Sequence, residues 1–86
     1  MDIEGKVCVI TGAASGIGRA AAIELQKHKI GALALVDLSG AVLELAQEIN
    51  KLRGKTIATG FQGDTTDAEF RKHVYETMRS QHGPVN

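Results

Sequence analysis

A glycine-rich segment near the N-terminus has the composition of a phosphate-binding loop. It reads Thr-Gly-Ala-Ala-Ser-Gly-Ile-Gly over residues 11–18. Gly12 permits a sharp turn at positive φ, Gly16 places no Cβ in the path of a phosphate, and Gly18 permits a helix to pack closely on the sheet. The first turn of a following helix would direct unpaired N–H groups and its dipole at the anion. The residues expected in this site are Gly12, Ser15, Gly16, Ile17 and Gly18.

A carboxylate follows at the distance along the chain that a bound adenosine requires. Asp37 lies about 20 residues after Gly18, where a dinucleotide-binding fold places an acid that accepts hydrogen bonds from the ribose hydroxyls. The same charge would repel a 2′-phosphate, and the next residue, Leu38, brings no compensating cation. Asp37 and Leu38 therefore join the expected site and favour NAD over NADP. The alternative is that Asp37 only caps a helix.

The hydropathy pattern predicts three strand–helix cycles that would position these residues. Apolar runs predict strands over residues 6–11, 32–36 and 56–61. Apolar stripes at helical spacing predict helices over residues 17–29, 39–54 and 66–83, the last ending near Gly83-Pro84. Ser39 is expected to cap the second helix, and Thr66 with Glu69 forms the pattern of a capping box for the third.

Each predicted helix has one face that would be buried against the sheet. The residues expected on these faces are Ile17, Ala21 and Leu25, then Val42, Leu45, Ala46, Ile49 and Leu52, then Phe70, Val74 and Met78. The alternation in the third strand predicts that Ile57, Thr59 and Phe61 share a face.

Alternation of strands and helices indicates an α/β fold with a parallel sheet. Right-handed crossovers place the first two helices on one face of the sheet and give the strand order 3-2-1. The expected architecture is a three-layer, doubly wound sheet of the Rossmann type that is partial, because the first strand would be central in a complete sheet. That strand would leave an open edge, and self-association into a homo-oligomer would cover it.

The loop spacing also carries a family resemblance. Thr-Gly-x-x-x-Gly-x-Gly at residues 11–18, with Gly5-Lys6-Val7 before it and Arg19-Ala20 after it, resembles the short-chain dehydrogenase/reductase family over essentially the whole chain. A methyltransferase is an alternative with the same fold, since it also has a glycine loop after the first strand and an acid after the second. Methyltransferase loops lack the Thr-Gly-x-x-x-Gly-Ile-Gly spacing, which disfavours this alternative. The resemblance implies an NAD(P)-dependent oxidoreductase that transfers hydride between nicotinamide and an alcohol or carbonyl substrate. It also implies that Asp64 contacts the adenine and Thr65 lines its pocket, with an Asx turn as the alternative for Asp64.

The resemblance implies catalytic groups that have no counterpart in this sequence. Tyr75 is followed by Arg79, which stays protonated and does not replace the family's lysine, so no catalytic residue is assigned. We expect residues 1–86 to be the N-terminal part of a Rossmann domain, inactive alone, with the catalytic half absent. The alternatives are a genuine short nucleotide-binding protein without catalysis, and part of an NADP-dependent 3-oxoacyl-acyl-carrier-protein reductase.

Composition excludes several other classes. Ten basic and ten acidic residues leave a net charge of zero, which lacks the basic footprint of a nucleic-acid binder. No apolar run approaches the roughly 20 residues of a membrane span. A single cysteine, Cys8, and an acidic, polar start predict a cytoplasmic protein. The histidines lack metal-ligand spacing, so no metal is expected.

Overall fold

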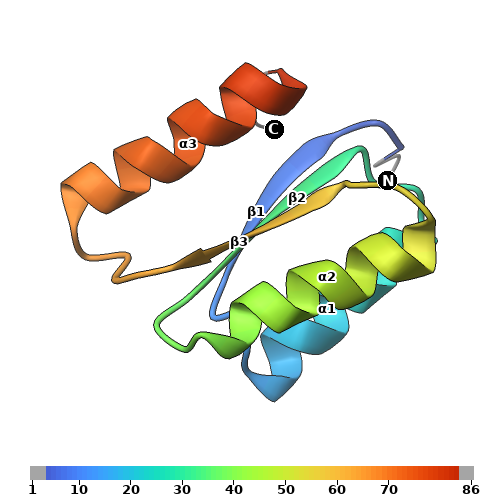
Figure 1. The fold of residues 1–86 in the computed structure, drawn as a ribbon, viewed down its shortest axis with the longest axis horizontal. Helices are drawn as coiled ribbons and strands as arrows, with labels where there is room; N and C mark the ends of the chain where they lie inside the picture. The colour runs from blue at the N-terminus through green and yellow to red at the C-terminus, as the bar shows by residue number, and fades with distance from the viewer. Residues whose placement is uncertain (1–3, 84–86) are drawn as a thin grey trace.

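Three parallel strands alternate with three helices in the structure, a computed structural model that describes residues 4–83 (Figure 1). The elements are β1 Val7–Thr11, α1 Gly16–Lys27, β2 Ala32–Asp37, α2 Ala41–Arg53, β3 Ala58–Gln62 and α3 Ala68–His82. All six predicted elements are present, with ends that differ by at most two residues. Gly83 forms the C-cap of α3, and Pro84 lies outside the described residues.

The strands form one sheet in the order β1-β2-β3, with both pairs parallel. Helices α1 and α2 cover one face of the sheet, and α3 covers the other (Figure 1). This arrangement confirms the predicted three-layer, partial doubly wound fold and its strand order. Parallel strands all end at the same edge, so the loops that follow them meet there.

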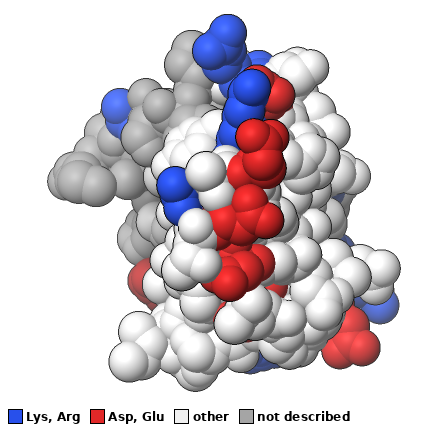
Figure 2. Space-filling model, turned by 90° about the vertical axis from the view of Figure 1, so that its left-hand side faces the viewer, with Lys and Arg blue, Asp and Glu red and all other residues white. Residues whose placement is uncertain are grey.

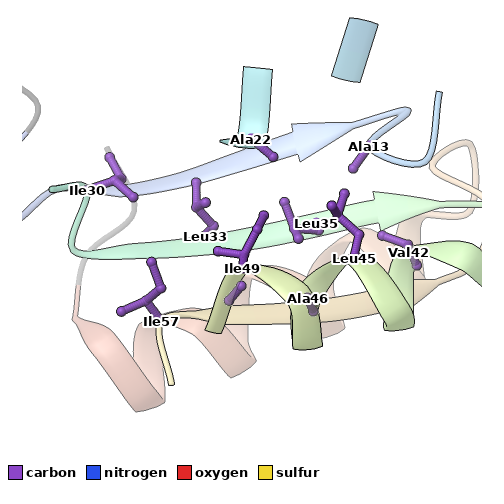
Figure 3. Packing of buried hydrophobic residues seen from close by; sticks show 11 residues of the cluster. Ala13, Ala22, Ile30, Leu33, Leu35, Val42, Leu45, Ala46, Ile49 and Ile57 are labelled. Atoms are coloured by element: carbon purple, nitrogen blue, oxygen red, sulfur yellow. The ribbon is translucent and has the colours of Figure 1, made fainter. Parts of the chain in front are cut away.

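The central strand β2 explains the continuous apolar run in the sequence, because both of its faces are covered. Leu33 and Leu35 pack into the cluster under α1 and α2 (Figure 3). Ala34 and Val36 pack on the opposite side, under α3. The core therefore lies on both faces of β2, and this strand carries Asp37 at its carboxyl end. None of the described helices has the length and hydropathy to cross a membrane.

The predicted buried face of α1 was wrong by one residue. The side chain of Ile17 is 88% exposed, and Ala21 is also exposed. Gly18 and Ala22 are buried instead, with Leu25 partly buried. The reason is the close approach of Gly18 to the preceding loop, which fixes the rotation of the helix and turns its neighbour Ile17 to the solvent.

Two other predictions about buried faces need correction. Leu52 on α2 is 59% exposed, whereas the other four predicted residues of that helix are buried. Ile57 and Phe61 pack in opposite clusters, so they do not share a face. The side chain of Asn50 accepts the N–H groups of both Ile57 and Ala58, at 2.8 and 2.7 Å. These bonds draw the chain toward α2 before the strand alternation begins.

The predicted helix caps are also revised. The capping residue of α3 is Asp67, whose carboxylate accepts the N–H groups of Glu69 and Phe70. Thr66 does not cap the helix, because its hydroxyl donates to Asp64 instead. At α2 the N-cap position is held by Gly40, while the hydroxyl of Ser39 accepts the N–H of Ala41 at 3.2 Å.

Candidate functional site

The glycine loop turns the chain from the end of β1 into α1. Gly12 has a φ of 66°, as the sequence predicted, and this conformation favours glycine. The carbonyl oxygen of Gly12 accepts the Ser15 N–H at 3.1 Å and the Ser15 hydroxyl at 2.6 Å. The Ala13 N–H donates to the Val36 carbonyl at 3.1 Å. The loop is therefore fixed both to itself and to β2.

The first turn of α1 leaves two backbone donors open. The Ser15 hydroxyl oxygen caps the helix by accepting the Gly18 N–H at 3.2 Å. Within residues 4–83, the N–H groups of Gly16 and Ile17 have no hydrogen-bond acceptor. The turn also contains no acidic residue. Open donors and an uncompensated helix dipole together form an environment that favours an anion.

The two glycines of this turn have different roles. A Cβ on Gly16 would meet no atom within 4 Å, so the space above its backbone is free for a ligand. A Cβ on Gly18 would collide with the Gly12 carbonyl oxygen and lie 2.8 Å from its carbon. Gly18 thus permits close packing as predicted, but against the loop rather than the sheet.

Asp37 is the last residue of β2, and its carboxylate organises the neighbouring loops. One oxygen accepts the Ser39 N–H and the other accepts the Ala14 N–H, each at 2.9 Å. These two backbone donors hold the pKa of Asp37 below its usual value of 3.8. The alternative, that Asp37 only caps a helix, is not observed, because the N-cap of α2 is Gly40. The carboxylate stays charged at neutral pH beside the glycine loop.

Asp64 follows β3 and closes a local turn. One of its oxygens accepts both the N–H and the hydroxyl of Thr66, at 2.9 and 2.8 Å. These bonds lower the pKa of Asp64 from its usual value of 3.8. Arg71 holds the same loop by donating to the Thr65 carbonyl at 2.7 Å. The observed geometry is the Asx turn, and an adenine contact stays a prediction for Asp64 and Thr65.

The loops after the three strands surround a cleft of about 200 Å³. It brings together the predicted residues Gly12, Asp37, Leu38, Asp64 and Thr65. Its lining also includes Val36 and Gly63, which were not predicted as site residues. A Cβ on Gly63 would collide with the ring of Phe70, so only glycine fits at this position. The sequence signal that could have identified Gly63 is a glycine between the end of a strand and the start of a helix. The other predicted residues, Ser15 to Gly18, lie outside this lining.

A sequence model of one protein family, described as short chain dehydrogenase, matches residues 6–86. The chain belongs to this family. It is 40% identical to a cyclohexanol dehydrogenase of Rhodococcus sp. (strain TK6), a match that covers 100% of this chain and 36% of that protein. It is 36% identical to a 3-oxoacyl-acyl-carrier-protein reductase of Thermotoga maritima, covering 100% of this chain and 34% of the reductase.

Solved structures of the family share the fold. L-sorbose reductase from Gluconobacter frateurii, complexed with NADPH and L-sorbose, superposes with a TM-score of 0.83 at 33% identity. A short-chain dehydrogenase/reductase from Burkholderia phymatum, in complex with NAD, gives 0.87 at 28% identity. The matches cover 99% and 100% of this chain but 33% and 30% of those chains. The chain therefore spans about a third of the length of the proteins that it matches.

Other reactive side chains of the chain do not line the cleft. Tyr75 is half exposed on α3 and lines a different pocket, whose wall also includes Thr11, Val36 and Thr65. Cys8 lies on β1 and is partly buried against the core. His28 is paired with Glu24 at 3.1 Å. No group of side chains suited to a metal ion is found in the described residues.

Proposed function

We propose that this chain binds the adenosine and pyrophosphate part of NAD at the carboxyl edge of its sheet. The pyrophosphate accepts hydrogen bonds from the open N–H groups of Gly16 and Ile17, and the adenosine enters the adjoining cleft. Asp37 accepts the ribose hydroxyls, while Leu38, Asp64 and Thr65 line the adenine pocket. The observation that carries the proposal is the pair of unsatisfied backbone donors in a turn without an acid.

The charges around the cleft favour NAD over NADP. Asp37 is ionised at neutral pH, because two backbone N–H groups stabilise its charge. A 2′-phosphate at the same ribose would meet this carboxylate, and a like-charge contact costs several kcal/mol. The nearby cation Arg19 is already paired with Glu48. Of the two structural relatives, one holds NAD and the other NADPH, so the family accommodates both.

The whole protein is proposed to be an oxidoreductase that interconverts an alcohol and a carbonyl compound. The nicotinamide ring of the bound cofactor would supply or accept the hydride. The described residues of this chain fix the adenosine end of the cofactor, and they include no Tyr–Lys pair that would move the proton. We therefore expect residues 1–86 alone to bind the cofactor without turnover. A homo-oligomer in the cytoplasm is the proposed setting.

Calorimetric titration of the protein with NAD and with NADP tests this proposal. The expected result is binding of both, with NAD the tighter ligand. Asp37→Asn keeps the side-chain size but removes the charge, so it should narrow the difference between the two Kd values. Failure of both cofactors to bind would contradict the proposed function. Tighter binding of NADP would retain the site but contradict the assigned cofactor.

A further inference from the structure

A second cavity lies next to the proposed cofactor site, between the starts of α1 and α2. Its volume is about 150 Å³, and it is lined by Ala14, Arg19, Ala41, Glu44, Leu45 and Glu48. Ala14 links the cavity to the cofactor cleft, because its N–H donates to Asp37. Ala14 is therefore in contact both with the Asp37 carboxylate and with the cavity that Arg19 lines.

Arg19 is the only cation among the described residues that line this cavity. Its guanidinium donates to both carboxylate oxygens of Glu48, on the neighbouring helix, at 2.9 and 2.7 Å. This bidentate pair engages N–H groups of the planar guanidinium, the same groups with which arginine binds phosphate. The carboxylate of Glu44 lines the same cavity and has no ion pair within the described chain.

We propose that Glu48 is a positioning residue for cofactor selection, because its pairing with Arg19 withholds the guanidinium from a 2′-phosphate beside Asp37. The inference rests on the proposed function. Without Glu48, Arg19 would be free to turn toward the loop at Ala14 and to neutralise a phosphate there. With Glu48 in place, NADP would meet the charge of Asp37 with no available cation. Selection against NADP thus depends on a residue of α2 outside the cleft.

The test is the ratio of the Kd values for NADP and NAD, measured by calorimetry in the intact protein. Glu48→Gln removes the charge but keeps the side-chain size. It should lower the ratio about threefold to fivefold, because the half-exposed Arg19–Glu48 pair no longer competes with the phosphate for the guanidinium. The Kd for NAD should stay unchanged. Glu48→Asp, which keeps the carboxylate, should retain a ratio near that of the wild type.

Two further variants separate release of Arg19 from simple loss of charge. Glu44→Gln removes one negative charge from the same cavity without releasing Arg19, so it should change the ratio by less than about twofold. Arg19→Gln combined with Glu48→Gln should return the ratio to the wild-type value. An unchanged ratio in Glu48→Gln, or an equal change in Glu44→Gln, would overturn the inference even where NAD binds. Failure of the wild type to bind NAD would instead overturn the proposed function.

Discussion

Helices α1 and α3 begin at the same edge of the sheet, but their first turns differ in charge and in hydrogen bonding. In α1 the cap is the neutral Ser15, and the N–H groups of Gly16 and Ile17 are open. In α3 the cap is the carboxylate of Asp67, which accepts two N–H groups at 2.9 and 3.4 Å. Glu69 adds a second acid to that turn.

The difference explains why the proposed anion site lies at the start of α1 and not at the start of α3. The dipole of α3 is compensated by the chain's own carboxylates, so a phosphate would be repelled there. Figure 2 shows acidic side chains in a column on the side of the molecule where α3 begins. In the first turn of α1 no carboxylate of the chain compensates the dipole, and the open N–H groups can donate to a bound anion.

The largest effect is expected when the open turn itself is deformed. Gly18→Ala should lower the free energy of unfolding by about 1–3 kcal/mol, because the new methyl group meets rigid loop backbone. It should also abolish NAD binding. Gly16→Ala is the matched control, since its methyl group enters free space. That variant should keep the stability within about 0.5 kcal/mol but weaken NAD binding. Urea unfolding and calorimetry measure both; equal stability losses would contradict this assignment.

A charge placed in the open turn should make α1 resemble α3. Ile17 is exposed, so Ile17→Glu removes no core contact. The new carboxylate should raise the free energy of unfolding by about 0.3–1 kcal/mol through the helix dipole. It should weaken NAD binding by about a hundredfold through repulsion of the pyrophosphate. Ile17→Gln controls for the change of shape. Retained NAD affinity in Ile17→Glu would mean that the phosphates bind elsewhere.

The reverse change removes the internal anion from α3. Asp67→Ala should lower the free energy of unfolding by about 1 kcal/mol, because two helix donors lose their acceptor. NAD affinity should not change, since α3 begins outside the proposed site. Asp67→Asn can still cap and should retain most of the stability. Chemical denaturation of the three proteins measures the effect, and an equal loss in both variants would exclude capping as its cause.

The smallest effect concerns the pH range over which Asp37 holds the loop of α1. Its folded pKa lies below 3.8, so the carboxylate stabilises the fold fully above its unfolded pKa of about 3.9. This contribution is lost as the pH falls through the lower, folded pKa. The stability difference between wild type and Asp37→Asn should therefore be constant from about pH 8 to about pH 5. A difference that declines across this interval in urea unfolding would show that Asp37 is not held as described.

The fold, and most of the residues that line the cleft, could be predicted because their signals are local in the sequence. The continuous apolar run of β2 requires cover on both faces, and this requirement fixes a parallel sheet with Asp37 at its edge. Gly12 was recognised from the turn between a strand and a helix. The cleft then follows from topology, since parallel strands end together.

The features that were missed depend on contacts between distant residues or on competition among neighbours. The buried face of α1 is set by the approach of Gly18 to Gly12, which periodicity does not report. Asp67 replaced Thr66 as a cap because the threonine hydroxyl was already engaged by Asp64. The pairing of Arg19 joins two helices, so no sequence spacing indicated it.

The contrast between the two helix starts can be tested most directly by amide NMR. A ¹H–¹⁵N spectrum of the protein, titrated with NAD, reports each backbone N–H separately. We expect the Gly16 and Ile17 signals to shift as NAD binds, because their open donors gain an acceptor. The signals of Glu69 and Phe70 should remain in place, because the Asp67 carboxylate already accepts their N–H groups. Shifts at α3 without shifts at Gly16 and Ile17 would contradict the proposal that the phosphates bind at the start of α1.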